Sequence, residues 1–347
     1  MIRPGRRRPS ASHCRRAASA PIFDPTGTDM DRRSLLVGGI AAGLAVPGLG
    51  PTGAPRRSHR TIRLWPGRPP GAADVTVTQR AVRRSATSPP DDLAFYGVTE
   101  PTLAVLRPER PNGIALLMVP GGGYERVATA PDGGALAHLF ADRGFTVGTL
   151  LYRLPYDGWA AGPDAPLQDA QRAFRLLARD AGAATRVGVI GFSAGGHVAG
   201  SLAGRFADAT YDRVDEAESL PARPDFAGLF FPVITMADPY AHAQSRRNLI
   251  GKAPDADRIR RWSLEQNVPA DMPPTFLAAA ADDRTVPVEN SMMMFAALRR
   301  RKVPSAIHIF DIGGHGFGTP GDATGPGHFW PDLFEDWLGR HVAGMPR

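Results

Sequence analysis

Cysteine is almost missing from this sequence, since Cys14 is the only one among 347 residues. A single thiol excludes an intramolecular disulfide, a cysteine-ligated metal cluster and a CxxC redox pair. The fold must therefore be held together by packing. A hydrophobic content of 43% in a chain of this length is enough for one large core.

The body of the chain also lacks net charge, although the whole chain carries +7. Residues 1–60 contain eleven arginines and three aspartates, which leaves 30 basic and 31 acidic side chains in residues 61–347. Nucleic-acid binding requires a basic surface on the folded domain. The charge distribution therefore argues against a nucleic-acid partner.

A long hydrophobic run is missing as well. The stretch from Leu35 to about Gly50 is short and rich in glycine and alanine, whereas a membrane-spanning helix needs about 20 apolar residues. It follows the paired arginines Arg32 and Arg33, a pattern typical of a twin-arginine export signal. We expect a periplasmic or secreted protein with no stable membrane span in its mature form, and the alternative is a single N-terminal anchor helix.

These features divide the chain into three segments. Residues 1–29 are rich in Arg, Pro, Ser and Ala without apolar periodicity, which is typical of disorder. Alternatively Met30 is the true start and residues 1–29 are not translated. Residues 30–60 form the expected signal and linker, and residues 61–347 form the expected folded domain.

Strand-like and helix-like segments alternate through most of residues 61–347. Alternation of this kind predicts an α/β fold with a doubly wound, mostly parallel sheet flanked by helices. The first three strands are expected to form an antiparallel edge. Strands are predicted at 62–65, 75–78, 103–106, 113–119, 145–152, 187–190, 226–231, 275–280 and 306–310. Helices are predicted at 131–143, 166–181, 197–203, 288–301 and 331–341, and residues 236–273 are interpreted as a small insertion over the site.

The pentapeptide from Gly191 to Gly195 has the pattern GxSxG and lies between a predicted strand and a predicted helix. In this setting a sharp, strained turn exposes the serine hydroxyl as a nucleophile. A side chain at Gly191 or Gly195 would collide where strand and helix cross. The context therefore predicts Ser193 as the nucleophile.

A serine nucleophile needs a histidine to accept its proton and a carboxylate to hold that histidine. In this fold class both follow the serine in the chain. His315 is the predicted histidine, because it lies in a glycine-rich loop directly after the last strand. Asp283 is the predicted acid, because the spacing to Val286 leaves a turn that aims its carboxylate at the neighbouring loop. Asp282 is the alternative.

Two further interpretations accompany this triad. Asp283 can also cap the helix that follows it, which is compatible with catalysis. Among the other downstream histidines, His197 is expected to pack or cap, and His308 lies in the middle of a predicted strand. His328 is expected to open the last helix, and His242 and His341 are expected at the surface.

Three consecutive glycines follow the strand at 113–119. Backbone N–H groups of Gly122 and Gly123, together with that of Ala194, are the predicted oxyanion-hole donors. A phosphate-binding loop is disfavoured, since no Lys-Ser/Thr pair and no GxGxxG spacing accompany the glycines. Tyr124 and Trp159 are candidates for lining the substrate pocket, with simple packing as the alternative.

The combination of motifs resembles the α/β-hydrolase esterases, in particular the acetyl xylan esterase-like members (BD-FAE and esterase/lipase-like branch). The resemblance covers roughly residues 61–343. One departure is Pro120, where many relatives carry histidine before the glycines. The motifs are 120–124, 152–154, 169–173, 191–197, 274–277, 283–287, 289–291 and 313–318.

The resemblance implies a serine carboxylesterase that removes short acyl groups, such as acetyl, from plant polysaccharides through an acyl-enzyme. It implies a small-molecule or polysaccharide ester as partner, with no metal, no coenzyme and no other cofactor. The alternatives are a feruloyl esterase, a prolyl oligopeptidase-like peptidase and a non-catalytic binding protein with the same fold. Neither the acyl group nor the oligomeric state can be read from the sequence.

Overall fold

The computed structural model describes residues 59–183, 185–318 and 325–342. The expectations for residues 1–29, and the predicted export signal within 30–60, lie outside these residues. Among the helices of the described ranges, none combines the length and the apolar character needed to cross a membrane.

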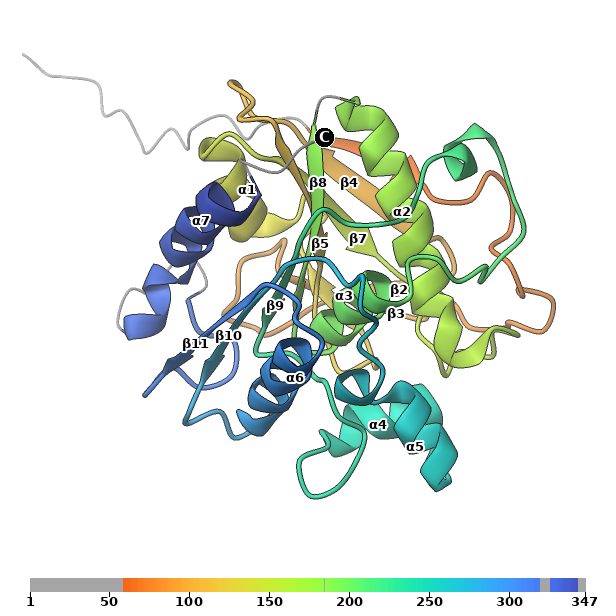
Figure 1. The fold of residues 1–347 in the computed structure, drawn as a ribbon. Coiled ribbons are helices and arrows are strands. Elements are labelled where there is room, and N and C mark those ends of the chain that lie inside the picture. Colours follow the sequence, from red (N-terminus) through yellow and green to blue (C-terminus); the bar gives the residue numbers. More distant parts are fainter. Residues whose placement is uncertain (1–58, 184, 319–324, 343–347) are drawn as a thin grey trace, which may run out of the picture. The chain divides into compact units, whose positions relative to one another are not determined.

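An eight-stranded sheet forms the centre of the described chain, as predicted (Figure 1). Its strand order is β1-β4-β7-β5-β8-β9-β10-β11. β4 runs antiparallel to both of its neighbours, and all other neighbouring pairs are parallel. The expected antiparallel edge is therefore confirmed for the strands at 59–63 and 102–106. The strands are β1 (His59–Arg63), β4 (Thr102–Leu106), β5 (Ile114–Val119), β7 (Thr146–Leu151), β8 (Arg186–Phe192), β9 (Ala227–Phe230), β10 (Thr275–Ala280) and β11 (Ser305–Phe310).

Helices cover both faces of this sheet, as the doubly wound prediction requires. In Figure 1, α1 and α7 lie on one side of the sheet, whereas α2, α3 and α6 lie on the other. The five predicted helices begin and end within a few residues of their predicted ranges, whereas α4 and α5 of the insertion were not predicted. The helices are α1 (Gly134–Asp142), α2 (Ala165–Ala181), α3 (Ala194–Gly204), α4 (Ala243–Ile250), α5 (Ala256–Trp262), α6 (Glu289–Arg300) and α7 (Trp330–His341).

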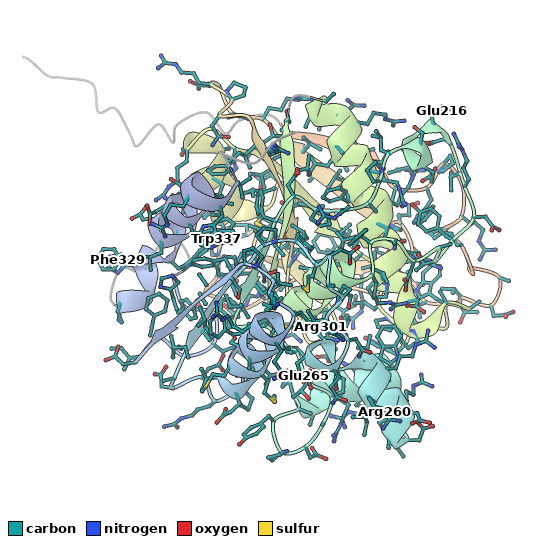
Figure 2. All side chains as sticks on the ribbon, viewed as in Figure 1. Glu216, Arg260, Glu265, Arg301, Phe329 and Trp337 are labelled. Atoms are coloured by element: carbon teal, nitrogen blue, oxygen red, sulfur yellow. The ribbon has the colours of Figure 1, made fainter. Side chains whose placement is uncertain are left out.

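Two hydrophobic cores result, one on each face. In β5, Leu117 packs into the core under α2 and α3, while Leu116 and Met118 pack into the core under α1 and α7. A strand that is apolar throughout is typical of a sheet covered on both faces. In Figure 2, Phe329 lies at the outer edge of the molecule and is exposed, whereas Trp337 of α7 lies further in and is buried in the second core.

The strand predicted at 75–78 is wrong. Its alternating Val and Thr residues are typical of a strand, yet the structure gives this segment no regular hydrogen-bond ladder. The nearby strands instead form a separate three-stranded antiparallel sheet that the sequence analysis missed. These strands are β2 (Arg80–Arg83), β3 (Leu93–Tyr96) and β6 (Val127–Thr129).

The insertion at 236–273 contains α4, α5 and a short 3-10 turn, η3 (Leu264–Gln266). It follows β9 and precedes β10. Figure 1 shows α4 and α5 together, near α3 and α6 and away from α1 and α7. The remaining 3-10 turns are η1 (Gly162–Asp164), η2 (Glu216–Ser219) and η4 (Pro326–Phe329).

Candidate active site

Ser193 occupies the sharp turn between β8 and α3. Its φ of 55° and ψ of −122° lie in a backbone region that non-glycine residues rarely adopt. A Cβ at Gly191 would overlap the carbonyl oxygen of Gly195, and a Cβ at Gly195 would overlap the carbonyl oxygens of Val119 and Pro120. The predicted reason for both glycines, close approach of strand and helix, is confirmed.

The carboxyl ends of β8, β10 and β11 lie at one edge of the sheet, since these strands run parallel. The residues just beyond those ends meet there. His315 Nε2 lies 2.9 Å from the Oγ of Ser193, and its Nδ1 lies 2.7 Å from the Oδ2 of Asp283. The structure thus brings the three predicted triad residues into one hydrogen-bonded chain.

Asp283 is buried and ionised in this arrangement. Burial acts to raise the pKa of its carboxyl, but hydrogen bonds from His315 and from the backbone N–H groups of Val286 and Thr285 outweigh it, so the pKa lies below its ordinary value. A carboxylate can only accept hydrogen bonds. The Nδ1 of His315 therefore carries the proton that it donates to Asp283, which leaves Nε2 to accept the hydroxyl proton of Ser193.

Asp282, the alternative acid, contacts the backbone of the His315 loop rather than the imidazole. Its Oδ1 accepts a hydrogen bond of 2.7 Å from the backbone N–H of Gly314. The two neighbouring carboxylates thus hold the histidine loop together, Asp283 through the ring and Asp282 through the backbone. Neither carboxylate caps α6, whose N-cap residue Val288 offers no side-chain hydrogen bond.

The loop after β5 lies directly beside the serine. A Cβ on Gly121 would be 3.0 Å from the Cβ of Ser193. The carbonyl oxygen of Pro120 accepts a 2.9 Å hydrogen bond from the buried hydroxyl of Tyr152, which anchors the loop to the end of β7.

The predicted oxyanion donors lie around this junction. Among the hydrogen bonds of the described ranges, none occupies the backbone N–H of Gly122, Gly123 or Ala194. Donors that are already free and fixed in place can receive a developing negative charge without reorganisation.

His197, which lies in the first turn of α3 after the serine, does not contact the triad residues. It is buried, with its Nε2 2.8 Å from the carbonyl oxygen of Trp262 and its Nδ1 2.8 Å from the hydroxyl of Tyr124. Burial lowers its pKa to about 4, so the ring is neutral. Since a carbonyl only accepts, Nε2 carries the hydrogen and Nδ1 accepts from Tyr124. The predicted packing position of His197 is confirmed.

Neither candidate pocket residue presents a face to a substrate beside the triad. Tyr124 is 1% exposed, and its hydroxyl is hydrogen-bonded to His197. Trp159 is 4% exposed and packs on the guanidinium of Arg153. It lines a cavity of about 360 Å³ with Trp65 and residues near the end of β1, and no triad residue lines that cavity. Tyr124, the aromatic residue next to the glycine loop, is therefore a packing residue.

His242 is a neighbour of the triad that sequence reasoning placed at the surface. It is half-buried at the start of α4, where its Nδ1 lies 2.8 Å from the Oγ of Ser245. Burial lowers its pKa, the nearby charge of His315 lowers it further, and that of Asp283 opposes the change. In the sequence, no motif connects His242 with the triad. Its position near the start of the insertion was the single indication of that proximity.

Three or more His, Cys, Asp or Glu side chains do not gather into a metal-binding group anywhere in the described ranges. The chemistry available at the site is that of the hydroxyl, the imidazole, the carboxylate and the backbone donors. A hydroxyl hydrogen-bonded to an oriented imidazole beside free N–H groups is suited to nucleophilic acyl transfer.

Known proteins resemble this chain over much of its length. The family model BD-FAE matches residues 107–298. A protein named endo-1,4-beta-xylanase B from Butyrivibrio fibrisolvens is 34% identical over 250 residues, which are 71% of this chain and 38% of that protein. An acetylxylan esterase from Xylanibacter ruminicola is 31% identical over 220 residues, 61% of this chain and 42% of that protein. The chain spans less than half the length of these curated relatives.

Solved structures show the same fold. An acetyl ester-xyloside bifunctional hydrolase from Caldicellulosiruptor lactoaceticus superposes with a TM-score of 0.62 at 32% identity, over 81% of this chain and 96% of that one. The carboxylesterase Cest-2923 from Lactobacillus plantarum WCFS1 gives a TM-score of 0.55 at 21% identity, over 76% of this chain and 97% of that one. With the family model matching more than half of its length, this chain belongs to the BD-FAE family and has the α/β-hydrolase fold.

Proposed function

We propose that this chain is a serine carboxylesterase that removes short acyl groups, with acetyl as the first choice, from carbohydrate such as xylan. One observation carries the proposal: the imidazole of His315 lies within hydrogen-bond distance of both the Ser193 hydroxyl and the Asp283 carboxylate. Hydrogen-bond contact on both sides of one ring is what a general base needs.

In the first half of the proposed reaction, the Oγ of Ser193 attacks the ester carbonyl carbon while its proton moves to the Nε2 of His315. Asp283 stabilises the imidazolium that forms. The carbonyl oxygen becomes an oxyanion and accepts hydrogen bonds from the N–H groups of Gly122, Gly123 and Ala194. The bond to the alcohol oxygen then breaks, and His315 returns the proton to that oxygen, which leaves an acyl-serine and a free hydroxyl group.

In the second half, a water molecule attacks the acyl-serine. His315 accepts a proton from the water and donates it to the Oγ of Ser193 as the carbon–oxygen bond breaks. The acid is released and the serine is restored. No step consumes a coenzyme or an electron.

The choice of substrate is supported by relatives. The Xylanibacter relative is named an acetylxylan esterase, and the Caldicellulosiruptor structure an acetyl ester-xyloside bifunctional hydrolase. The Butyrivibrio relative is named a xylanase, which points to the same polysaccharide. Acetylated xylan is therefore the first substrate to test.

The test incubates residues 59–347 separately with acetylated xylan, feruloylated arabinoxylan, acetylated pectin and a proline-containing peptide, with Ser193→Ala as control. Products are identified by mass spectrometry. We expect acetate from xylan with the wild-type protein only. Ferulate as the main product would favour a feruloyl esterase, and peptide cleavage would favour a peptidase. Equal product from wild type and Ser193→Ala would contradict the serine mechanism.

We also propose that the protein acts outside the cytoplasm, after export through its twin-arginine segment. This rests on Arg32, Arg33 and the apolar stretch after them. The test fractionates cells that express the full chain and maps the N-terminal peptide by mass spectrometry. A mature protein in the periplasm or medium that begins between about residues 50 and 61 is expected. A protein that is cytoplasmic and retains Arg32 would contradict the proposal.

A further inference from the structure

Helix α4 of the insertion is hydrogen-bonded to the loop that carries the predicted oxyanion donors. The side-chain Nδ2 of Asn248 donates a 2.9 Å hydrogen bond to the carbonyl oxygen of Gly123. One turn earlier, the Nε2 of Gln244 donates a 2.6 Å hydrogen bond to the Oε2 of Glu125. Residues four apart lie on one face of a helix, so one face of α4 is directed at this loop.

The helix itself is firmly held. Its last two residues, Leu249 and Ile250, are buried in the main core. The segment before it is tied to α6 by the buried Asn290, whose Oδ1 accepts from the N–H groups of Ile234 and Thr235 and whose Nδ2 donates to the carbonyl oxygen of Tyr240. A side chain on α4 can therefore impose a position on the loop that it contacts.

The loop needs such a constraint at Gly123. The preceding carbonyl, that of Gly122, already accepts from the N–H groups of Glu125 and Arg126 inside the loop. Gly123 has a φ of 65°, and an added Cβ would make no more than ordinary contact with the side chain of Gln244, at 3.8 Å. Glycine has wide conformational freedom because it lacks a Cβ, so its peptide plane needs an external contact to fix it. Among the described contacts, the amide of Asn248 is the one that holds the Gly123 carbonyl.

We propose that Asn248 is a positioning residue that orients the oxyanion donors of the Gly122–Gly123 loop by holding the carbonyl of Gly123. It does not touch the substrate; it fixes the peptide plane next to the donors. The inference rests on the proposed serine-esterase function, and it gives the insertion a part in the reaction itself. Oxyanion donors act only when they point at the place where charge develops.

The test compares three variants with wild type. Asn248→Ala removes the donor. Asn248→Asp keeps the shape but replaces the donor with a carboxylate that repels the Gly123 carbonyl. Asn267→Ala is the matched control, because the amide of Asn267 also donates to backbone carbonyls, those of Arg260, Arg261 and Ser263, but within the insertion.

The assay measures kcat and KM for p-nitrophenyl acetate and the inhibition constant of a phenylboronic acid, which forms a tetrahedral adduct on serine. Losing one donor outright costs about 10²- to 10³-fold in kcat, so misorientation by Asn248→Ala should cost about 10- to 100-fold, with KM changed less than about threefold. Asn248→Asp should lose more. The boronic acid should bind more weakly by the same factor as kcat, and Asn267→Ala should stay near wild type.

Thermal unfolding of each variant separates a loss of folding from a loss of orientation. If Asn248→Ala were unfolded, the isosteric Asn248→Asp would be the deciding variant. The inference is overturned if the folded variants keep kcat near wild type, or if KM alone rises. If wild type hydrolyses p-nitrophenyl acetate but not acetylated xylan, the proposed substrate fails while the role of Asn248 is still measured. A wild type inert toward every ester would overturn both.

Discussion

Two histidines near Ser193 are each held by two hydrogen bonds, yet they differ in burial and in the charge of their partners. His315 lies between the hydroxyl of Ser193 and the carboxylate of Asp283 and is partly exposed. His197 lies between the hydroxyl of Tyr124 and the carbonyl of Trp262 and is fully buried. A charged partner can stabilise an imidazolium, whereas neutral partners in a dry site cannot.

The partners of a histidine, rather than its distance in sequence from the serine, decide what the ring can do. His197 is four residues from Ser193 and belongs to the scaffold, while His315 is 122 residues away and reaches the hydroxyl. His197 also links the glycine loop after β5, through Tyr124, to the insertion, through Trp262. Its task is to hold together the elements that surround the site.

The largest difference between the two rings should be in activity. His315→Ala removes the base and should lower kcat for p-nitrophenyl acetate by about 10⁴-fold or more, as expected for a triad member. His197→Gln keeps a donor and an acceptor and should stay within about tenfold of wild type, because His197 takes no proton in the reaction. Steady-state kinetics on the two folded variants measures this. Similar losses of kcat in His315→Ala and His197→Gln would contradict different roles for the two histidines.

A smaller loss should separate the two neighbouring aspartates. Asp283→Asn takes away the charge that holds the tautomer of His315 and should cost about 10³- to 10⁴-fold in kcat. Asp282→Asn weakens only the bond to the Gly314 backbone, so we expect less than about tenfold. The same assay, with circular dichroism to check folding, decides between them. A larger loss for Asp282→Asn would identify it as the orienting acid.

The burial of His197 should make the free energy of unfolding depend on pH. Its pKa of about 4 in the folded protein lies below the ordinary value of 6.5. Between these pH values the unfolded chain therefore binds a proton at His197 that the folded chain does not bind. Stability should therefore fall as pH drops from about 6.5 to 4, by about 3 kcal/mol. Urea unfolding across this range should show a shallower fall in His197→Gln by about that amount. Parallel curves for variant and wild type would contradict a neutral, buried His197.

The smallest expected effect is that of replacing Tyr124, which donates a hydrogen bond to the ring of His197. Tyr124→Phe removes the hydroxyl that donates to Nδ1 of His197 and leaves a buried acceptor unpaired. Such a loss costs about 1–3 kcal/mol of unfolding free energy, and kcat should change little. Chemical denaturation together with the esterase assay measures both quantities. A marked rise in KM instead would mean that Tyr124 reaches the substrate.

Much of the fold could be predicted because its determinants are local. The strands β5, β8 and β10 are largely apolar runs, and α2 carries the core residues Leu167, Ala170, Phe174 and Leu177 at helical spacing. The arrangement of the triad could be anticipated for a related reason, since parallel strands deliver the residues after their ends to one edge. Chain order and glycine-rich context then pointed to Ser193, Asp283 and His315.

The rest depended on contacts that no local pattern encodes. Every residue of β2 is exposed, so its sequence lacks the apolar alternation that marks a strand. It forms because it pairs with β3, which in turn pairs with β6. The insertion contains no motif that shows where α4 returns to the site, and for that reason His242 and Asn248 could not be connected with the triad and the oxyanion loop beforehand.

The central claim is that Ser193 is a nucleophile made reactive by His315. The most direct measurement treats the protein with a fluorophosphonate, which reacts with activated serines, and locates the adduct by peptide mass spectrometry. We predict one phosphonyl group per chain, on the peptide that contains Ser193, and its absence in His315→Ala. An adduct on a different residue, or undiminished ester hydrolysis by a protein fully modified at Ser193, would contradict the account.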